Sequence, residues 1–178
     1  AIFRTTGDDL LIRLAGYLLP TATLRYAAKD GAVTAPLLNR SSPIDLAPFE
    51  ALRDTCTSKD GTKVPISIVR AKGLKLDGKR PTWLTGYGGY GVSIQPWFDP
   101  MAALWLQLGG VYVVANLRGG SELGEKWHQD GMLLKKQNVF DDLYACTERL
   151  AELKYAKAQT LVIEGGSNGG LLMGAVLT

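Results

Sequence analysis

The Gly-x-Ser-x-Gly pattern at residues 165–169 constrains most strongly what this chain can fold into. A short apolar run at 161–163 precedes it and predicts a buried β-strand, and a helical pattern starts directly after it. A serine hydroxyl between strand and helix is exposed only on a sharp, strained turn, where a Cβ at Gly165 or Gly169 would clash. The helix start also offers free N–H donors for a developing oxyanion. We therefore predict that Ser167 is a nucleophile. The alternative is a glycine-rich turn with an incidental serine.

Composition excludes several classes of protein. The 178 residues are 46% hydrophobic and 21% charged, which is ordinary for a globular protein. The formal net charge of +3 is too small to indicate a nucleic acid or an anionic membrane as partner. No apolar run is long enough for a transmembrane helix. Cys56 and Cys146 form neither a disulfide framework nor a zinc motif, so we predict two buried small side chains and no cofactor or metal.

The N-terminal part of the chain has an all-β pattern. Its short apolar runs are separated by turn residues, with Pro20 among the separators, and lie at 1–5, 10–14 and 23–26. Strands at this spacing are typical of a sheet or a propeller blade. One blade cannot bury its own faces, so we expect more chain before it. The polar segment 40–48 marks a candidate boundary between one domain at 1–48 and another at 49–178.

From residue 49 onward the pattern changes to α/β. Two strands at 50–57 and 64–69 flank a hairpin turn at Asp60-Gly61, and Pro65 places the second strand near a sheet edge. Strands and helices then alternate, with strands at 82–85, 111–115 and 161–163 and helices at 100–108 and 138–153. This alternation predicts a mostly parallel sheet with flanking helices. A hairpin, parallel strands and a serine turn, in this order, match the first half of an α/β-hydrolase.

The helix at 138–153 carries its own signals. Asn138 is the predicted N-cap, and Asp141 and Asp142 in the first turn favour the helix dipole. One apolar face is predicted, formed by Val139, Leu143, Cys146 and Leu150.

A loop of about twenty residues separates Asn116 from this helix, a length that suggests function. It contains His128, the only histidine. In α/β-hydrolases the chain order is serine, acid, histidine, and His128 precedes the serine. We therefore predict that His128 anchors the loop. An ion pair between Arg118 and Glu122 could shape the same loop.

The segment 86–91 matches the Gly-x-Gly-x-x-Gly pattern of dinucleotide sites. No helix follows it at once, and Asn116 stands where an acidic residue would hold a ribose. An oxyanion-hole loop fits better, because glycines let the backbone approach the site and a tyrosine hydroxyl can donate to the oxyanion. The structural alternative is two tyrosines packed on a glycine-rich turn.

Five ordered blocks of sequence together resemble the prolyl oligopeptidase family. They are 86–90, 116–120, 122–128, 136–142 and 165–170. The similarity is close over 49–178, and residues 1–48 resemble more loosely the end of the family's β-propeller. The resemblance implies a serine peptidase with a propeller domain and an α/β-hydrolase domain, which cuts short peptides after proline.

The resemblance also implies roles for single residues. Ser167 would be the nucleophile, and the backbone N–H of Asn168 and the hydroxyl of Tyr87 would form the oxyanion hole. Tyr90 stands where the family usually has a phenylalanine that lines the proline pocket. The asparagine directly after the serine, Asn168, is similar to the residue at this position in prolyl oligopeptidase itself. The related oligopeptidase B, which cuts after basic residues, more often has alanine at this position.

The resemblance implies that the catalytic Asp and His, and the arginine that grips the substrate carbonyl, would lie beyond Thr178. The chain also stops inside a helical pattern, so we expect it to lack the second half of its catalytic domain. Without a base the serine loses on the order of 10⁴–10⁶ in rate, and the sheet keeps an open edge. We expect the isolated chain to be inactive and poorly stable.

Four functional hypotheses remain at this stage. The first is a serine endopeptidase specific for proline. The second is an oligopeptidase B-like, acylaminoacyl-peptidase-like or esterase-like hydrolase. The third is a nucleotide-binding module built on the 86–91 loop, and the fourth is a non-catalytic interaction domain on a hydrolase scaffold.

Overall fold

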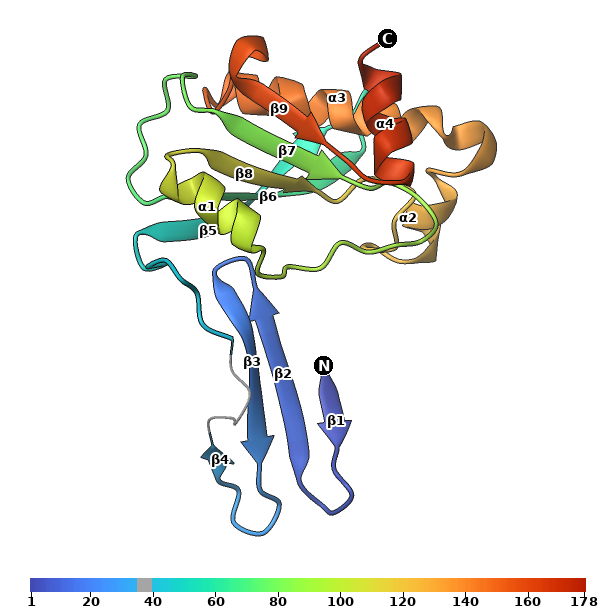
Figure 1. The fold of residues 1–178 in the computed structure, drawn as a ribbon. Coiled ribbons are helices and arrows are strands. Elements are labelled where there is room, and N and C mark those ends of the chain that lie inside the picture. The colour runs from blue at the N-terminus through green and yellow to red at the C-terminus, as the bar shows by residue number, and fades with distance from the viewer. Residues whose placement is uncertain (35–39) are drawn as a thin grey trace. The chain divides into compact units, whose positions relative to one another are not determined.

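A computed structural model describes residues 1–34 and 40–178 (Figure 1). The chain forms two compact units. The first comprises Ala1–Pro48 and Pro96–Leu104, and the second comprises Phe49–Gln95 and Trp105–Thr178.

The first unit holds a four-stranded antiparallel sheet in the order β1-β2-β3-β4. Its strands are β1 Ile2–Arg4, β2 Leu10–Gly16, β3 Leu19–Tyr26 and β4 Val33–Thr34. The three predicted strands are confirmed, but Pro20 lies inside β3 and does not separate elements. It is tolerated because the β2–β3 register shifts between Leu14 and Gly16, at an irregularity where a missing N–H does little harm. No described residue of 1–48 is fully buried, so the four-stranded sheet has no hydrophobic core formed by these residues alone.

The second unit is built on a five-stranded sheet in the order β5-β6-β8-β7-β9. Its strands are β5 Phe49–Thr57, β6 Lys63–Ala71, β7 Thr82–Gly86, β8 Val111–Ala115 and β9 Leu161–Glu164. Strand β6 runs antiparallel to β5 and β8, whereas β7 runs parallel to β8 and β9. The α/β fold class is confirmed.

The prediction that Pro65 marks an edge strand is wrong, because β6 is paired on both sides. Pro65 lies just outside the β6–β8 ladder, whose first pair is Ile66 with Ala115. Its carbonyl oxygen accepts a hydrogen bond from the Asn116 N–H at 3.0 Å. Proline is therefore tolerated in an interior strand at the point where one ladder begins.

Four α-helices accompany the strands in the described part of the chain. They are α1 Pro100–Gln107, α2 Glu125–Gln129, α3 Gln137–Glu152 and α4 Asn168–Val176. Short 3₁₀ turns occur at η1 Leu133–Lys135 and η2 Ala158–Thr160. The segment predicted as one long loop thus contains α2 and η1. Helices α3 and α4 contact each other, and each contacts the sheet, α3 through β5 and β6 and α4 through β9 (Figure 1).

The apolar face predicted for α3 is confirmed, because all four of its residues are fully buried. They join the core of the second unit with side chains from β6 and β8, among them Ile66 and Val113. Cys56 and Cys146 are free and buried in this core, as predicted. A hydrogen bond with Cys56, together with burial, raises the pKa of the Cys146 thiol.

The first turn of α3 differs from the prediction. Lys136, and not Asn138, is the N-cap residue, and Asn138 lies inside the helix, where its Nδ2 donates to the Asp130 carbonyl at 2.8 Å. Asp142 does not serve the helix dipole. Its carboxylate is completely buried and pairs with the guanidinium of Arg118. A charged side chain that points into the core needs a partner of opposite charge, and this need outweighs the weaker interaction with the helix dipole.

Arg118 connects three separate segments and does not pair with Glu122, so that prediction is wrong. Its guanidinium donates to Asp142 at 2.6 Å, to Asp60 at 2.5 Å and to the Ser58 hydroxyl at 3.1 Å. The hydrogen bond from Arg118 lowers the pKa of Asp60 to about 2. The carboxylate of Glu122 instead accepts from the Ile94 N–H at 2.9 Å and from Asn116 Nδ2 at 3.2 Å.

Candidate active site at the turn between β9 and α4

The turn between β9 and α4, residues 165–169, is here called the elbow. Ser167 is exposed at its tip, with φ 53° and ψ −118°. A positive φ is uncommon for a residue other than glycine and costs of order 1–3 kcal/mol, which the surrounding structure must offset. Strained backbone of this kind is found where the position of a side chain matters for function.

The glycines beside Ser167 are required by close backbone contacts, as the sequence predicts. A Cβ on Gly165 would lie 2.5 Å from the carbonyl carbon of Gly169. A Cβ on Gly169 would lie 2.8 Å from the carbonyl oxygen of Gly86. The elbow is therefore packed both on itself and on the end of β7.

The 86–91 loop lies directly against the elbow. The Asn168 side-chain amide donates to the Tyr87 carbonyl at 2.5 Å, and a Cβ on Gly89 would lie 2.5 Å from the same amide nitrogen. The ring of Tyr87 also borders the elbow, because its Cδ2 would be 3.8 Å from a Cβ on Gly169. Three of the four predicted site residues, Ser167, Asn168 and Tyr87, thus come from segments in contact.

The fourth predicted site residue, Tyr90, is 79% exposed and has a positive φ of 55°. It lines a cavity of about 510 Å³ that also reaches Asn168. The other lining residues are Gly89, His128, Gly131, Met132, Leu133, Lys136 and Leu171. Tyr90 is therefore at an open, partly apolar hollow beside the elbow.

His128 anchors the segment that follows β8, as predicted. Its Nδ1 forms a hydrogen bond with the Gly119 carbonyl oxygen at 2.9 Å. Its ring also faces the 86–91 loop, because a Cβ on Gly91 would lie 3.8 Å from His128 Cγ. The histidine thus holds two segments near the elbow together.

Lys136 is a residue of this site that the sequence did not single out. Its ammonium group donates to the Gly88 carbonyl at 2.7 Å and to Asn168 Oδ1 at 3.1 Å. Burial lowers the pKa of Lys136. In the sequence it is one of two consecutive lysines before a helix, and a local pattern of that kind does not distinguish it from its neighbour Lys135.

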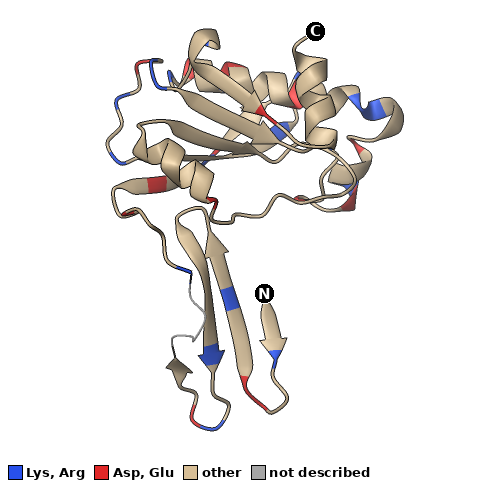
Figure 2. Ribbon diagram, viewed as in Figure 1, with Lys and Arg blue, Asp and Glu red and all other residues tan. Residues whose placement is uncertain are grey.

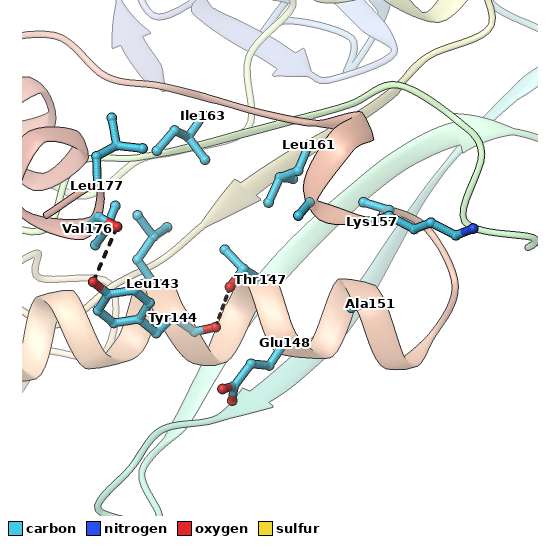
Figure 3. A pocket seen from close by; sticks show the side chains of 12 residues that line it. Leu143, Tyr144, Thr147, Glu148, Ala151, Lys157, Leu161, Ile163, Val176 and Leu177 are labelled. Atoms are coloured by element: carbon cyan, nitrogen blue, oxygen red, sulfur yellow. Dashed lines mark hydrogen bonds between the residues drawn. The ribbon is translucent and has the colours of Figure 1, made fainter.

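A second cavity of about 400 Å³ lies between α3, β9 and the end of α4 (Figure 3). Its apolar lining includes Leu143, Leu161 and Ile163. The Tyr144 hydroxyl at its border donates to the Val176 carbonyl at 3.3 Å. Strand β9 is outermost in its sheet, and the side chain of Val162 is half exposed. None of the predicted site residues lines this cavity.

Other kinds of site find little support in residues 1–34 and 40–178. Within those ranges, no three His, Cys, Asp or Glu side chains are placed to hold a metal ion. No helix there has the length and apolar character needed to cross a membrane. Lys and Arg residues are interspersed with Asp and Glu residues along the ribbon (Figure 2). The 86–91 loop packs on the elbow, and α1, the next helix, begins only at Pro100, which disfavours a dinucleotide site.

Comparisons with known proteins identify close relatives of the chain. The model of the prolyl oligopeptidase family matches residues 96–178. A prolyl endopeptidase from Elizabethkingia miricola is 49% identical over 175 residues, which are 97% of this chain and 24% of that protein.

Two solved structures show the same similarity. One, from a study of two prolyl endopeptidases, has a TM-score of 0.92 and 41% identity over 98% of this chain and 26% of the other. The other is prolyl oligopeptidase B from Galerina marginata bound to a 25mer macrocyclization substrate. Its TM-score is 0.91 with 35% identity, covering 99% of this chain and 25% of the other. The chain spans about a quarter of the length of the curated relatives it matches.

Proposed function

Because this chain belongs to the prolyl oligopeptidase family, we propose that it carries the nucleophile and the oxyanion hole of a serine peptidase that cuts short peptides after proline. The observation that carries the proposal is the exposed, strained Ser167 on a glycine-flanked turn against the 86–91 loop. We further propose that residues 1–48 belong to a β-propeller and residues 49–178 to the N-terminal half of an α/β-hydrolase domain.

The proposed reaction starts with attack of Ser167 Oγ on the scissile carbonyl carbon. Negative charge then develops on the carbonyl oxygen, where the Asn168 backbone N–H and the Tyr87 hydroxyl donate hydrogen bonds to it. Departure of the amine leaves an acyl-enzyme on Ser167, and water releases the acid. His128 is engaged by Gly119 and precedes Ser167 in the chain. We therefore propose that a general base outside residues 1–178 takes the proton of the Ser167 hydroxyl and then gives it to the leaving amine.

The substrate preference is proposed from the cavity beside the elbow. Tyr90 lines this cavity, and its aromatic face can stack on a pyrrolidine ring. Tyr90 as a whole is 79% exposed, so its ring is open to such a contact. A proline side chain would then be held next to the carbonyl group that Ser167 attacks.

Reporter substrates test the proposed function. In the complete protein, a Gly-Pro reporter peptide is expected to give a kcat/KM at least about 100-fold above that of a matched Gly-Arg peptide and of a simple acyl ester. A fluorophosphonate probe should label the protein, and Ser167→Ala should abolish the label. Preference for arginine would instead support an oligopeptidase B-like enzyme, and turnover of the ester alone an esterase. Absence of both label and hydrolysis would refute a serine hydrolase.

The proposed role of Tyr87 gives a second prediction. Tyr87→Phe removes one oxyanion donor and should lower kcat by about 10²- to 10³-fold, with KM within about twofold of wild type. Steady-state kinetics on the Gly-Pro reporter measure both parameters. Tyr144→Phe is the matched control, since it removes a hydroxyl at the second cavity and should leave kcat unchanged. A rise in KM with unchanged kcat would instead assign the Tyr87 hydroxyl to substrate binding.

A further inference from the structure

Three segments of the second unit meet at one ammonium group. Lys136, at the start of α3, donates to the Gly88 carbonyl of the 86–91 loop at 2.7 Å. It also donates to the side-chain oxygen of Asn168 in the elbow at 3.1 Å. Gly88 lies 48 residues before Lys136 in the chain, and Asn168 lies 32 residues after it.

The contacts of Lys136 differ from those of the other lysines at this end of the unit. Lys126 and Lys135 are exposed and pair with the carboxylate of Asp130. Lys136 is half-buried, and in the described residues no carboxylate lies within ion-pair distance of its ammonium group. Its acceptors are two amide-type oxygens, a geometry that orders these oxygens without neutralising the charge.

The two acceptors are adjacent to both groups of the proposed oxyanion hole. Asn168 provides the backbone N–H, and its side-chain oxygen accepts from Lys136 while its side-chain nitrogen donates to the Tyr87 carbonyl at 2.5 Å. Gly88 directly follows Tyr87, and its carbonyl accepts from the same ammonium. A closed ring of hydrogen bonds therefore runs from Lys136 through Asn168 to the backbone of residues 87 and 88.

Two features indicate that the 86–91 loop depends on its contact with Lys136. Tyr90, two residues after Gly88, is not a glycine and has a positive φ of 55°, so this part of the loop is held in a sparsely populated conformation. Lys136 is also half-buried, and this burial lowers the pKa of its amine.

We propose that Lys136 is a positioning residue that aligns the two oxyanion donors, Tyr87 and the Asn168 N–H, and adds positive potential where negative charge develops. This inference depends on the function proposed above and adds a residue to its site. Lys136 itself does not need to touch the substrate. The physical basis is that displacement of a catalytic group by about 1 Å can cost about 10²-fold in rate.

The test compares Lys136→Met with Lys135→Met in the complete protein, using the Gly-Pro reporter. Methionine is unbranched like lysine and only one atom shorter, and it removes the donors and the charge. We expect Lys136→Met to lower kcat by about 10- to 100-fold with KM within about twofold, because the lost alignment matters most in the transition state. Lys135→Met should stay within about twofold of wild type in both parameters. Lys136→Arg keeps the charge and the donors, so its kcat should be at least about threefold higher than that of Lys136→Met.

A double-variant experiment separates positioning from general loosening of the fold. If Lys136 acts through Tyr87, the combined kcat loss of Tyr87→Phe and Lys136→Met should be at least about fivefold smaller than the product of the single losses. Thermal unfolding checks that the variants are folded. Should Lys136→Met not fold, Lys136→Gln is measured by the same criteria.

The outcomes distinguish this inference from the proposed function. If the wild-type protein neither hydrolyses the reporter nor takes a fluorophosphonate label on Ser167, the proposed function fails. If the wild type is active and Lys136→Met matches Lys135→Met, or if the double variant shows the full product of the losses, the positioning role is overturned. A loss confined to KM overturns it as well.

Discussion

Replacing Ser167 with alanine is expected to lower kcat for a Gly-Pro reporter peptide by about 10⁴- to 10⁶-fold in the complete protein. The Ser167 hydroxyl is the only group that forms a covalent bond with the substrate in the proposed mechanism, so no neighbouring side chain replaces it. The effect should fall on kcat and not on KM, because the cavity beside Tyr90 and the oxyanion donors remain. Single-turnover and steady-state assays together measure this loss.

The variant should fold like the wild type. Alanine has the same Cβ and encounters the same backbone strain at φ 53°, and Ser167 is exposed, so no core contact is lost. Ser41→Ala, at another exposed serine, is the matched control and should retain full activity. Residual activity above about 1% of wild type, with the fluorophosphonate label retained, would show that another residue is the nucleophile.

Removing the carboxylate of Asp142 is expected to destabilise the protein by about 3–5 kcal/mol. The side chain of Asp142 is 0% exposed and that of Arg118 is 4% exposed, so Asp142→Ala leaves a buried guanidinium with only its outer partners. The same change removes an acceptor of the Arg118 backbone N–H, which donates to Asp142 at 3.0 Å. Urea and thermal unfolding measure the loss, which corresponds to a fall in Tm of about 6–20 °C at this domain size.

A more exposed ion pair provides the comparison. Asp54 pairs with Arg149 at 3.1 Å, and their side chains are 28% and 35% exposed. Asp54→Ala should therefore cost less than about 1 kcal/mol. A second comparison is the double change Arg118→Met with Asp142→Leu, which removes both buried charges and should recover much of the stability. Equal destabilisation by Asp142→Ala and Asp54→Ala would contradict the central role of the buried pair.

Much of this protein was predictable from its sequence because the relevant signals are local. The alternation of apolar runs with helical patterns predicted the five strands of the second unit and helices α3 and α4 within a few residues, but not the short helix α2. The glycines at 165 and 169 and the serine between them predicted the tight turn, since the backbone clash that requires them arises within five residues and at the neighbouring strand end.

The tertiary structure alone decided which distant groups meet. Asp142 was predicted to serve the dipole of its own helix, yet it pairs with Arg118, 24 residues away, because burial makes a charged partner necessary. Pro65 was predicted at an edge and lies in an interior strand, since the order of strands in a sheet is set by pairing and not by composition. Lys136 and Lys135 have the same side chain. Only Lys136 is approached by the 86–91 loop and the elbow, so it donates hydrogen bonds to Gly88 and Asn168 while Lys135 stays exposed to solvent. Local patterns determine elements and turns, whereas the partners of buried polar groups depend on how those elements pack together.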